Sequence, residues 1–254
     1  MSRSYKTEAV VLRSIRFGEA DRVLHLYSST EGRVGAIAKG ARRPRSRFGG
    51  RLEPFFRLNL VLYRGRGELS TVTSAETLDG YPRLRESGAA LDAAGRACDA
   101  VLRLLDAAEA NPPAYNLLCR YLALLDAHAA GDPAARGREA EHAAGMTLEV
   151  ALAFRLKLAL AAGFAPELAS CARCGEADGL VGFSGAAGGV VCGACEGGGF
   201  EISGDAHRFM VEALGAPLSE APAADRPALR QAERAISETL EHHAHVRLRA
   251  AAAA

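Results

Sequence analysis

Four cysteines in two close pairs constrain the fold of this chain more than any other feature. Each pair has the C-x₂-C spacing, Cys171 with Cys174 and Cys192 with Cys195, and seventeen residues separate the pairs. Two such turns bring four thiolates to the corners of a tetrahedron, about 2.3 Å from a Zn²⁺ ion, which is the geometry of a structural four-cysteine site. We therefore predict a small zinc ribbon at 171–199, inserted in a longer chain.

Two disulfides or four buried free thiols are the alternative uses of these cysteines. Disulfides are rare in a reducing cytosol, and the doubled motif favours a metal over both alternatives. Because a closed site with four thiolate ligands has no open coordination position, we expect the ion to stabilise the fold without taking part in catalysis. The remaining cysteines, Cys98 and Cys119, fall on apolar helical faces and are most simply core residues.

The first eighty residues have the pattern of short β-strands separated by turns. Apolar and polar residues alternate most clearly where Leu58, Leu60 and Leu62 share one face. Strands are expected at 9–15, 23–28, 34–38, 56–63 and 69–75. Five short strands in this length predict a small barrel of the OB-fold kind, although an SH3-like barrel would give much the same pattern.

Beyond residue 83 the apolar residues recur at helical spacing. Stripes at intervals of three and four residues predict helices around 98–108, 118–125, 148–160, 205–214 and 227–243. The stretch 134–144 has no apolar face and is expected to be an exposed connector, and 250–254 is expected to be a frayed end.

These patterns together predict a multidomain α+β protein. The N-terminal five-stranded OB-fold β-barrel is expected at 1–80. An α-helical domain is expected at 81–170 and 200–254, with the four-cysteine zinc module inserted at 171–199.

Charge is divided unevenly between these parts. Residues 1–80 hold 15 Lys and Arg against 8 Asp and Glu, a net of +7, whereas 81–254 hold 16 against 22, a net of −6. The formal net charge of the whole chain, +1, hides this difference. A basic barrel joined to an acidic remainder is expected when one part of a protein meets a polyanion.

The densest positive charge lies in the run 39–51, where six of thirteen residues are cationic. Such runs are usually solvated surface, but three features favour nucleic acid. Arginine predominates, and its planar fork binds phosphate and stacks on bases. Phe48 offers a stacking surface, and flanking strands would hold the run as a rim loop. The predicted nucleic-acid contacts are Lys39, Arg42, Arg43, Arg45, Arg47, Phe48 and Arg51, with Arg13, Arg22, Arg33 and Arg57 as weaker additions on neighbouring strands or turns.

Motifs of common enzyme classes are missing from the sequence. It contains no G-x-x-x-x-G-K-[ST], no G-x-S-x-G and no H-E-x-x-H. The histidines at 242, 243 and 245 are more typical of a solvated helix end than of a metal site. We expect no catalytic residue and no small-molecule substrate. The apolar runs are too short for a membrane helix and the N-terminus has no secretory pattern, so a cytoplasmic protein is expected.

Two stretches of the chain resemble the RecO family of bacterial recombination mediators. The first runs from Phe17-Gly-Glu-Ala-Asp-Arg through Glu31-Gly to Lys39-Gly-Ala-Arg-Arg-Pro-Arg-Ser-Arg-Phe-Gly-Gly-Arg-Leu-Glu-Pro-Phe. The second is Gly163-Phe-Ala-Pro-Glu-Leu, followed by the two cysteine pairs with Phe183-Ser and Gly188-Gly-Val-Val between them. The resemblance is specific over about 5–64 and 152–195 and compositional elsewhere, and the chain departs from the family where polyalanine follows Arg249.

The resemblance implies a non-enzymatic DNA repair and recombination mediator of the RecF pathway. Proteins of this family bind single- and double-stranded DNA and anneal complementary strands. With the partner RecR they help to load RecA on DNA coated by single-strand-binding protein. They also dock the acidic C-terminal tail of that binding protein, usually on the helical domain. One structural Zn²⁺ and a cytoplasmic, nucleoid-associated location are expected as well.

Two other classes of protein remain open from the residues themselves. An RNA-binding OB-fold protein with a structural zinc ribbon would show similar patterns, and competition between single-stranded DNA and structured RNA would distinguish it. A metal-dependent nuclease or hydrolase is disfavoured because the sequence shows no cluster of carboxylates.

Overall fold

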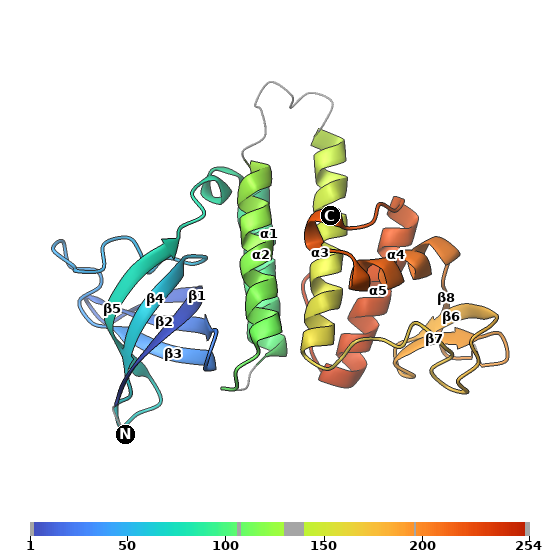
Figure 1. Ribbon diagram of the computed structural model, residues 1–254, viewed down its shortest axis with the longest axis horizontal. Helices are drawn as coiled ribbons and strands as arrows, with labels where there is room; N and C mark the ends of the chain where they lie inside the picture. The colour runs from blue at the N-terminus through green and yellow to red at the C-terminus, as the bar shows by residue number, and fades with distance from the viewer. Residues whose placement is uncertain (1–2, 106–107, 130–139, 196, 252–254) are drawn as a thin grey trace. The chain divides into compact units, whose positions relative to one another are not determined.

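The structure, a computed structural model, describes the chain except for residues 1–2, 106–107, 130–139, 196 and 252–254. The chain divides into two compact units, Met1–Ala130 and Gly131–Ala254. Each unit is described by itself below (Figure 1). The boundaries predicted for the barrel, helical and zinc-binding parts stay a prediction.

Five strands in the first unit close into a barrel. The strands neighbour one another in the order β1-β2-β3-β5-β4, and all pairs are antiparallel except β3 with β5. Their bounds are β1 Ser4–Phe17, β2 Asp21–Ser28, β3 Gly32–Ala38, β4 Arg57–Tyr63 and β5 Ser70–Asp79. The predicted five-stranded OB-fold barrel is confirmed.

Alternation along the strands fills the barrel. Leu58, Leu60 and Leu62 on β4 are all fully buried, as their spacing of two residues predicted. Leu24 and Leu26 of β2 meet them in one apolar cluster. The same alternation leaves the intervening residues of these strands on the outer surface of the barrel.

Two helices complete the first unit, after a short 3₁₀ turn at Arg83–Glu86. The first, α1, spans Gly88–Leu104, and the Ser87 hydroxyl caps it by accepting a hydrogen bond from the backbone N–H of Ala90. The second, α2, spans Pro112–Ala129, and the two helices pack on each other (Figure 1). Helix α1 ends four residues before the predicted 108, whereas Cys98 is buried as predicted.

A polar cluster fastens α2 to the barrel. Arg57 of β4 pairs with the Glu8 carboxylate of β1 at 2.7 Å, and its Nε donates to the Tyr115 hydroxyl of α2 at 3.3 Å. That hydroxyl donates in turn to Glu8 at 3.4 Å. The Glu8 carboxylate raises the pKa of Arg57 above its usual value. These contacts fix the start of β4 against α2.

The second unit contains three helices, α3 Ala140–Ala161, α4 Gly204–Gly215 and α5 Arg226–Thr239. The 3₁₀ turn Leu218–Glu220 precedes α5, and a π-helical turn, Leu240–Ala244, extends it, so the helix predicted at 227–243 is confirmed. The predicted connector 134–144 is wrong at 140–144, which already belongs to α3, and its earlier part lies outside the described residues.

A buried arginine of α3, Arg155, links this helix to α5 and to the C-terminal segment. The buried Arg155 guanidinium pairs with Glu233 of α5 at 3.3 Å and also donates to the backbone oxygen of Arg249. The end predicted to fray is partly fixed: Ala251 is buried and its N–H donates to Glu233, while 252–254 lie outside the described residues.

A small sheet carries the cysteine segment. Its strands β6 Leu180–Ser184, β7 Gly189–Cys192 and β8 Phe200–Glu201 lie in the order β7-β6-β8. Phe183 of β6 and Phe200 of β8 contact each other with ring centroids 5.7 Å apart. Across the described residues, no helix is both long enough and apolar enough to span a membrane.

Candidate nucleic-acid interface and metal centre

The loop between β3 and β4 carries the densest positive charge and is held by apolar anchors. Ala41, Phe48 and Leu52 lie in the barrel core, with exposed fractions of 8, 1 and 2%. The cationic residues of the loop are all exposed: Lys39, Arg42, Arg43, Arg45, Arg47 and Arg51. Because anchors lie on both sides of the run of arginines at 42–47, their burial fixes the path of the loop and leaves the cations at the surface.

The base-stacking role predicted for Phe48 is wrong. Its ring is 1% exposed within the barrel core, and the guanidinium of Arg47 lies 4.9 Å from its centroid. A base could reach this ring only if the close-packed core opened. A phenylalanine among arginines fits an exposed stacking surface and a core anchor equally well in sequence, and only the fold separates the two.

Backbone contacts dock the start of the loop on the turn between β1 and β2. The N–H of Gly40 donates to the Asp21 carboxylate at 2.7 Å, and the N–H of Arg42 donates to the oxygen of Ala20 at 2.8 Å. Gly40 has a φ of +67°, a conformation that a glycine adopts without strain. The first cations of the loop therefore lie beside the end of the β1–β2 hairpin.

The four weaker additions differ in their surroundings. Arg13 is exposed on β1. Arg22 pairs with Glu53 at 2.6 Å, and Arg57 belongs to the cluster with Glu8, so both guanidiniums have structural partners. Arg33 donates to the backbone oxygen of Leu102 at 3.3 Å. We therefore expect Arg13 to be the most available of the four to a ligand.

Two exposed apolar side chains on the barrel were not predicted as site residues. Ile15 is 43% exposed and Phe17 is 55% exposed, near the end of β1. The strand continues two residues past its predicted end at 15, so Arg13, Ile15 and Phe17 follow one another at strand spacing. A basic residue followed by two apolar residues on one face of the strand was the available signal.

The four cysteines of the second unit converge as the spacing predicted. Their Sγ atoms all lie within 4.8 Å of one another. Cys171 and Cys192 are buried, Cys195 is half-buried and Cys174 is exposed. Among the described residues, this is the one group of histidine, cysteine and carboxylate side chains close enough to hold a metal ion.

Backbone turns aim the sulfur atoms at a common point. Within the first pair, the N–H of Gly175 donates to the oxygen of Cys171 at 2.8 Å, and Gly175 has a φ of +80°. In the second pair, the N–H of Cys195 donates to the oxygen of Cys192 at 2.8 Å. Arg173 donates to the backbone oxygen of Cys195 at 2.9 Å and links the two turns.

The electrostatics of the cluster suit a divalent cation. Backbone N–H groups, first that of Cys192, lower the pKa of Cys171 to about 6 and favour its thiolate. Hydrogen bonds with the neighbouring cysteine side chains, Cys174 first, raise the pKa of Cys195, because they favour the form in which this thiol keeps its proton. A cation with thiolate affinity would replace the retained protons, so this set of donors fits a metal site with four cysteine ligands.

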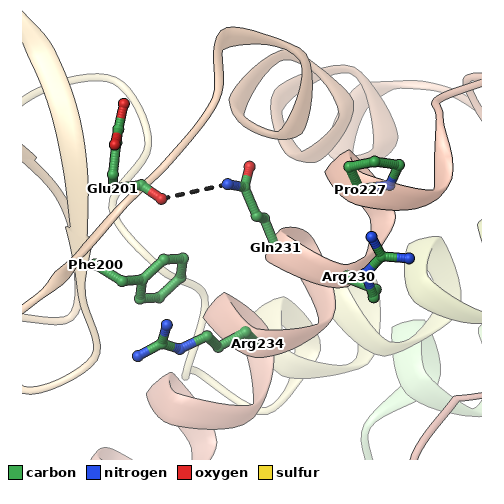
Figure 2. Close-up of a pocket in the computed structure, with 6 residues that line it drawn as sticks. All are labelled: Phe200, Glu201, Pro227, Arg230, Gln231 and Arg234. Carbon is green, nitrogen blue, oxygen red and sulfur yellow. Dashed lines mark hydrogen bonds between the residues drawn. The ribbon is translucent and has the colours of Figure 1, made fainter.

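A shallow groove lies where the small sheet meets α5. It has a volume of about 420 Å³ and is lined by Phe200, Glu201, Pro227, Arg230, Gln231 and Arg234 (Figure 2). The Gln231 amide donates to the backbone oxygen of Glu201 at 3.4 Å, and the Arg234 guanidinium lies 4.0 Å from the Phe200 ring centroid. Arg234 also pairs with Glu238 at 2.7 Å. These contacts join the cysteine-bearing sheet to the helix.

Two family descriptions match consecutive parts of the chain. The family described as "Recombination protein O N terminal" matches residues 1–81, and "Recombination protein O C terminal" matches residues 85–251. The chain belongs to the RecO family. The first match spans the RecO barrel with its basic loop, and the second spans the helices and the cysteine cluster.

Relatives named DNA repair protein RecO are similar over most of their length. One from Rubrobacter xylanophilus is 41% identical, over 75% of this chain and 71% of the relative. One from Anaeromyxobacter dehalogenans strain 2CP-C is 35% identical, over 96% of this chain and 93% of the relative. A third, from Pelotomaculum thermopropionicum, is 38% identical, over 75% and 68%.

Proposed function

We propose that this RecO chain is a DNA repair and recombination mediator that binds single- and double-stranded DNA and anneals complementary strands. The observation that carries the proposal is the loop between β3 and β4. Its six exposed cations are fixed on the barrel by Ala41, Phe48 and Leu52, which lie in the core. The names of the relatives, all DNA repair proteins, support the same role.

Annealing requires that two phosphate backbones approach each other against their repulsion. Guanidinium groups neutralise phosphates by charge-assisted hydrogen bonds, and they do so without reading the base sequence. A rim loop with arginines at 42, 43, 45 and 47 presents several such groups within a short span. Sequence-independent contact is what a protein needs to pair strands of any sequence.

The cysteine cluster has a supporting role in this proposal. Cys171, Cys174, Cys192 and Cys195 would hold one Zn²⁺, which supplies structural cross-linking and no open coordination position when bound. The surrounding chain contributes only a small core there, formed by Cys171, Val191 and Cys192. We propose accordingly that the protein catalyses no reaction, and incubation with DNA and Mg²⁺ or Mn²⁺ should leave the DNA uncut.

Partners beyond DNA form the finer part of the proposal. We infer that the protein acts with RecR to help load RecA, and that it docks the acidic C-terminal tail of single-strand-binding protein. Both inferences rest on membership of the RecO family. We infer from the proposed action on DNA that the protein works in the cytoplasm, at the nucleoid.

Annealing of complementary oligonucleotides coated with single-strand-binding protein tests the proposal. The wild-type protein should accelerate duplex formation at least tenfold over the protein-free reaction, and removal of the tail of the binding protein should abolish the effect. A variant with Arg42, Arg43, Arg45 and Arg47 changed to Ala should anneal poorly even on naked strands. Equal annealing by this variant and the wild type would contradict the role of the loop.

A further inference from the structure

The outer face of β1, β2 and β3 carries an apolar row that crosses all three strands. Ile15 pairs with Val23, and Val23 pairs with Ile37. Residues directly opposite each other in a sheet present their side chains on the same face. Leu24 and Ala36, which alternate with Val23 and Ile37 along β2 and β3, are fully buried in the barrel core. The row therefore lies on the opposite face, away from the core.

A second row beside it carries basic side chains. Arg13 pairs with His25, which pairs with Gly35, two residues along each strand from the apolar row. Arg33 lies two further residues along β3 on the same face. Burial, together with the charges of Arg33 and Arg13, lowers the pKa of His25.

The solvent-exposed apolar residues of this face lie at its end near the β1–β2 turn. Beyond the irregularity between Val11 and Arg13, the partners Val10 and Tyr27 are buried, with exposed fractions of 0 and 1%. On the near side, Ile15 is 43% exposed and Phe17 is 55% exposed. The irregularity between Val11 and Arg13 therefore separates a buried part of the outer face, around Val10 and Tyr27, from an exposed part, around Ile15 and Phe17.

Charge on the open part favours an anionic ligand. Phe17 pairs with Asp21, whose carboxylate already accepts a hydrogen bond from the N–H of Gly40. Lys39 follows directly after β3 and is exposed, and it begins the basic loop. An apolar row flanked by cations suits bases and phosphates together.

We propose that this face is a stacking platform for the unpaired bases of single-stranded nucleic acid, with Phe17 as the stacking ring and Ile15 beside it. The proposal rests on the proposed function and adds to it a preference for single-stranded over double-stranded DNA. Phosphates are exposed in single and double strands alike, whereas base faces are free only in single strands. The basic loop therefore serves both forms of DNA, and the platform favours the single-stranded form.

Binding of a single-stranded oligonucleotide and of a duplex of equal length, measured by fluorescence anisotropy, separates the two roles. Phe17→Ala should weaken single-strand binding about tenfold, the loss of roughly one base stack, and should change duplex binding less than twofold. Leu78→Ala removes a side chain of similar exposure, 43%, from β5 and should change neither. The four-arginine variant of the loop should weaken both.

A tryptophan reporter tests stacking directly, because the chain contains no Trp. In Phe17→Trp, single-stranded DNA should quench the indole emission while duplex quenches it little, and Leu78→Trp should show no quenching with either. If Phe17→Ala proved unstable, stronger quenching of Phe17→Trp by single-stranded DNA than by duplex would still support the platform.

Three results would overturn the platform. The first is equal weakening of single-strand and duplex binding by Phe17→Ala, and the second is no weakening of either. The third is a loss of RecR binding by Phe17→Ala with DNA binding intact, which would make the face a protein-docking surface. If only the four-arginine variant fails to weaken DNA binding, the role of the loop fails and the platform stands.

Discussion

Two loop-rich segments of this chain differ in what holds them in an ordered conformation. The loop between β3 and β4 is ordered by Phe48 and Leu52, which enter a barrel core that the strands already provide. The cysteine segment has only a small apolar cluster of its own. We propose that a metal cation, which would neutralise the four thiolates, orders this segment instead. On the proposed function, burial in the first segment presents charge to a ligand outside it, and a bound ion would order the second segment from within.

This difference is the basis of the different roles that we propose for the two segments. Cations that are not needed for folding can remain exposed and bind phosphate, which is the role that we propose for the loop. Thiolates that surround an ion have no free coordination position and serve stability. Substitutions should therefore damage binding in the first segment and folding in the second.

Loss of the metal site should give the largest effect. Cys171→Ser with Cys192→Ser removes two of four ligands, and metal binding in such small modules contributes about 10 kcal/mol or more to their folding. We expect loss of zinc by elemental analysis, a lower Tm and poor solubility, with single-strand affinity of the folded fraction changed less than twofold. Cys98→Ser, outside the cluster, is the matched control for zinc content. Full solubility and Tm without bound zinc would show that the metal does not order this segment.

Substitution of the loop anchor should give the next largest effect. Phe48→Ala leaves a cavity in the barrel core and should cost about 3–5 kcal/mol of unfolding free energy, measured by urea denaturation. Phe17→Ala removes the same ring from an exposed position and should cost less than about 0.5 kcal/mol. If Phe48→Ala kept its stability and lost single-strand binding instead, the ring would be a ligand contact after all.

The sequence predicted those features that depend on local spacing. Leu58, Leu60 and Leu62 revealed β4 because alternation alone decides which face of a strand is buried. The cysteine pairs revealed their cluster because a C-x₂-C turn needs only a few residues to aim two sulfur atoms. Both signals lie within one short segment of chain.

Features that depend on distant residues could not be predicted in this way. Arg22 and Arg57 looked like free cations because their partners Glu53 and Glu8 lie 31 and 49 residues away in sequence. Phe48 looked exposed because its neighbours are charged, although the strands of the barrel enclose it. Phe17 was missed as a site residue because its exposure depends on which part of the β1–β2 face the fold leaves uncovered.

The salt dependence of single-strand binding tests the central claim most directly. Removing one cation that neutralises a phosphate should flatten the slope of log K against log salt by about 0.7, so the Arg42, Arg43, Arg45 and Arg47→Ala variant should have a slope flatter by about 2 to 3. Its Tm should stay close to that of the wild type because these side chains are exposed. A reduced slope with an unchanged Tm is the predicted result, and an unchanged slope would contradict the assignment of the loop to DNA.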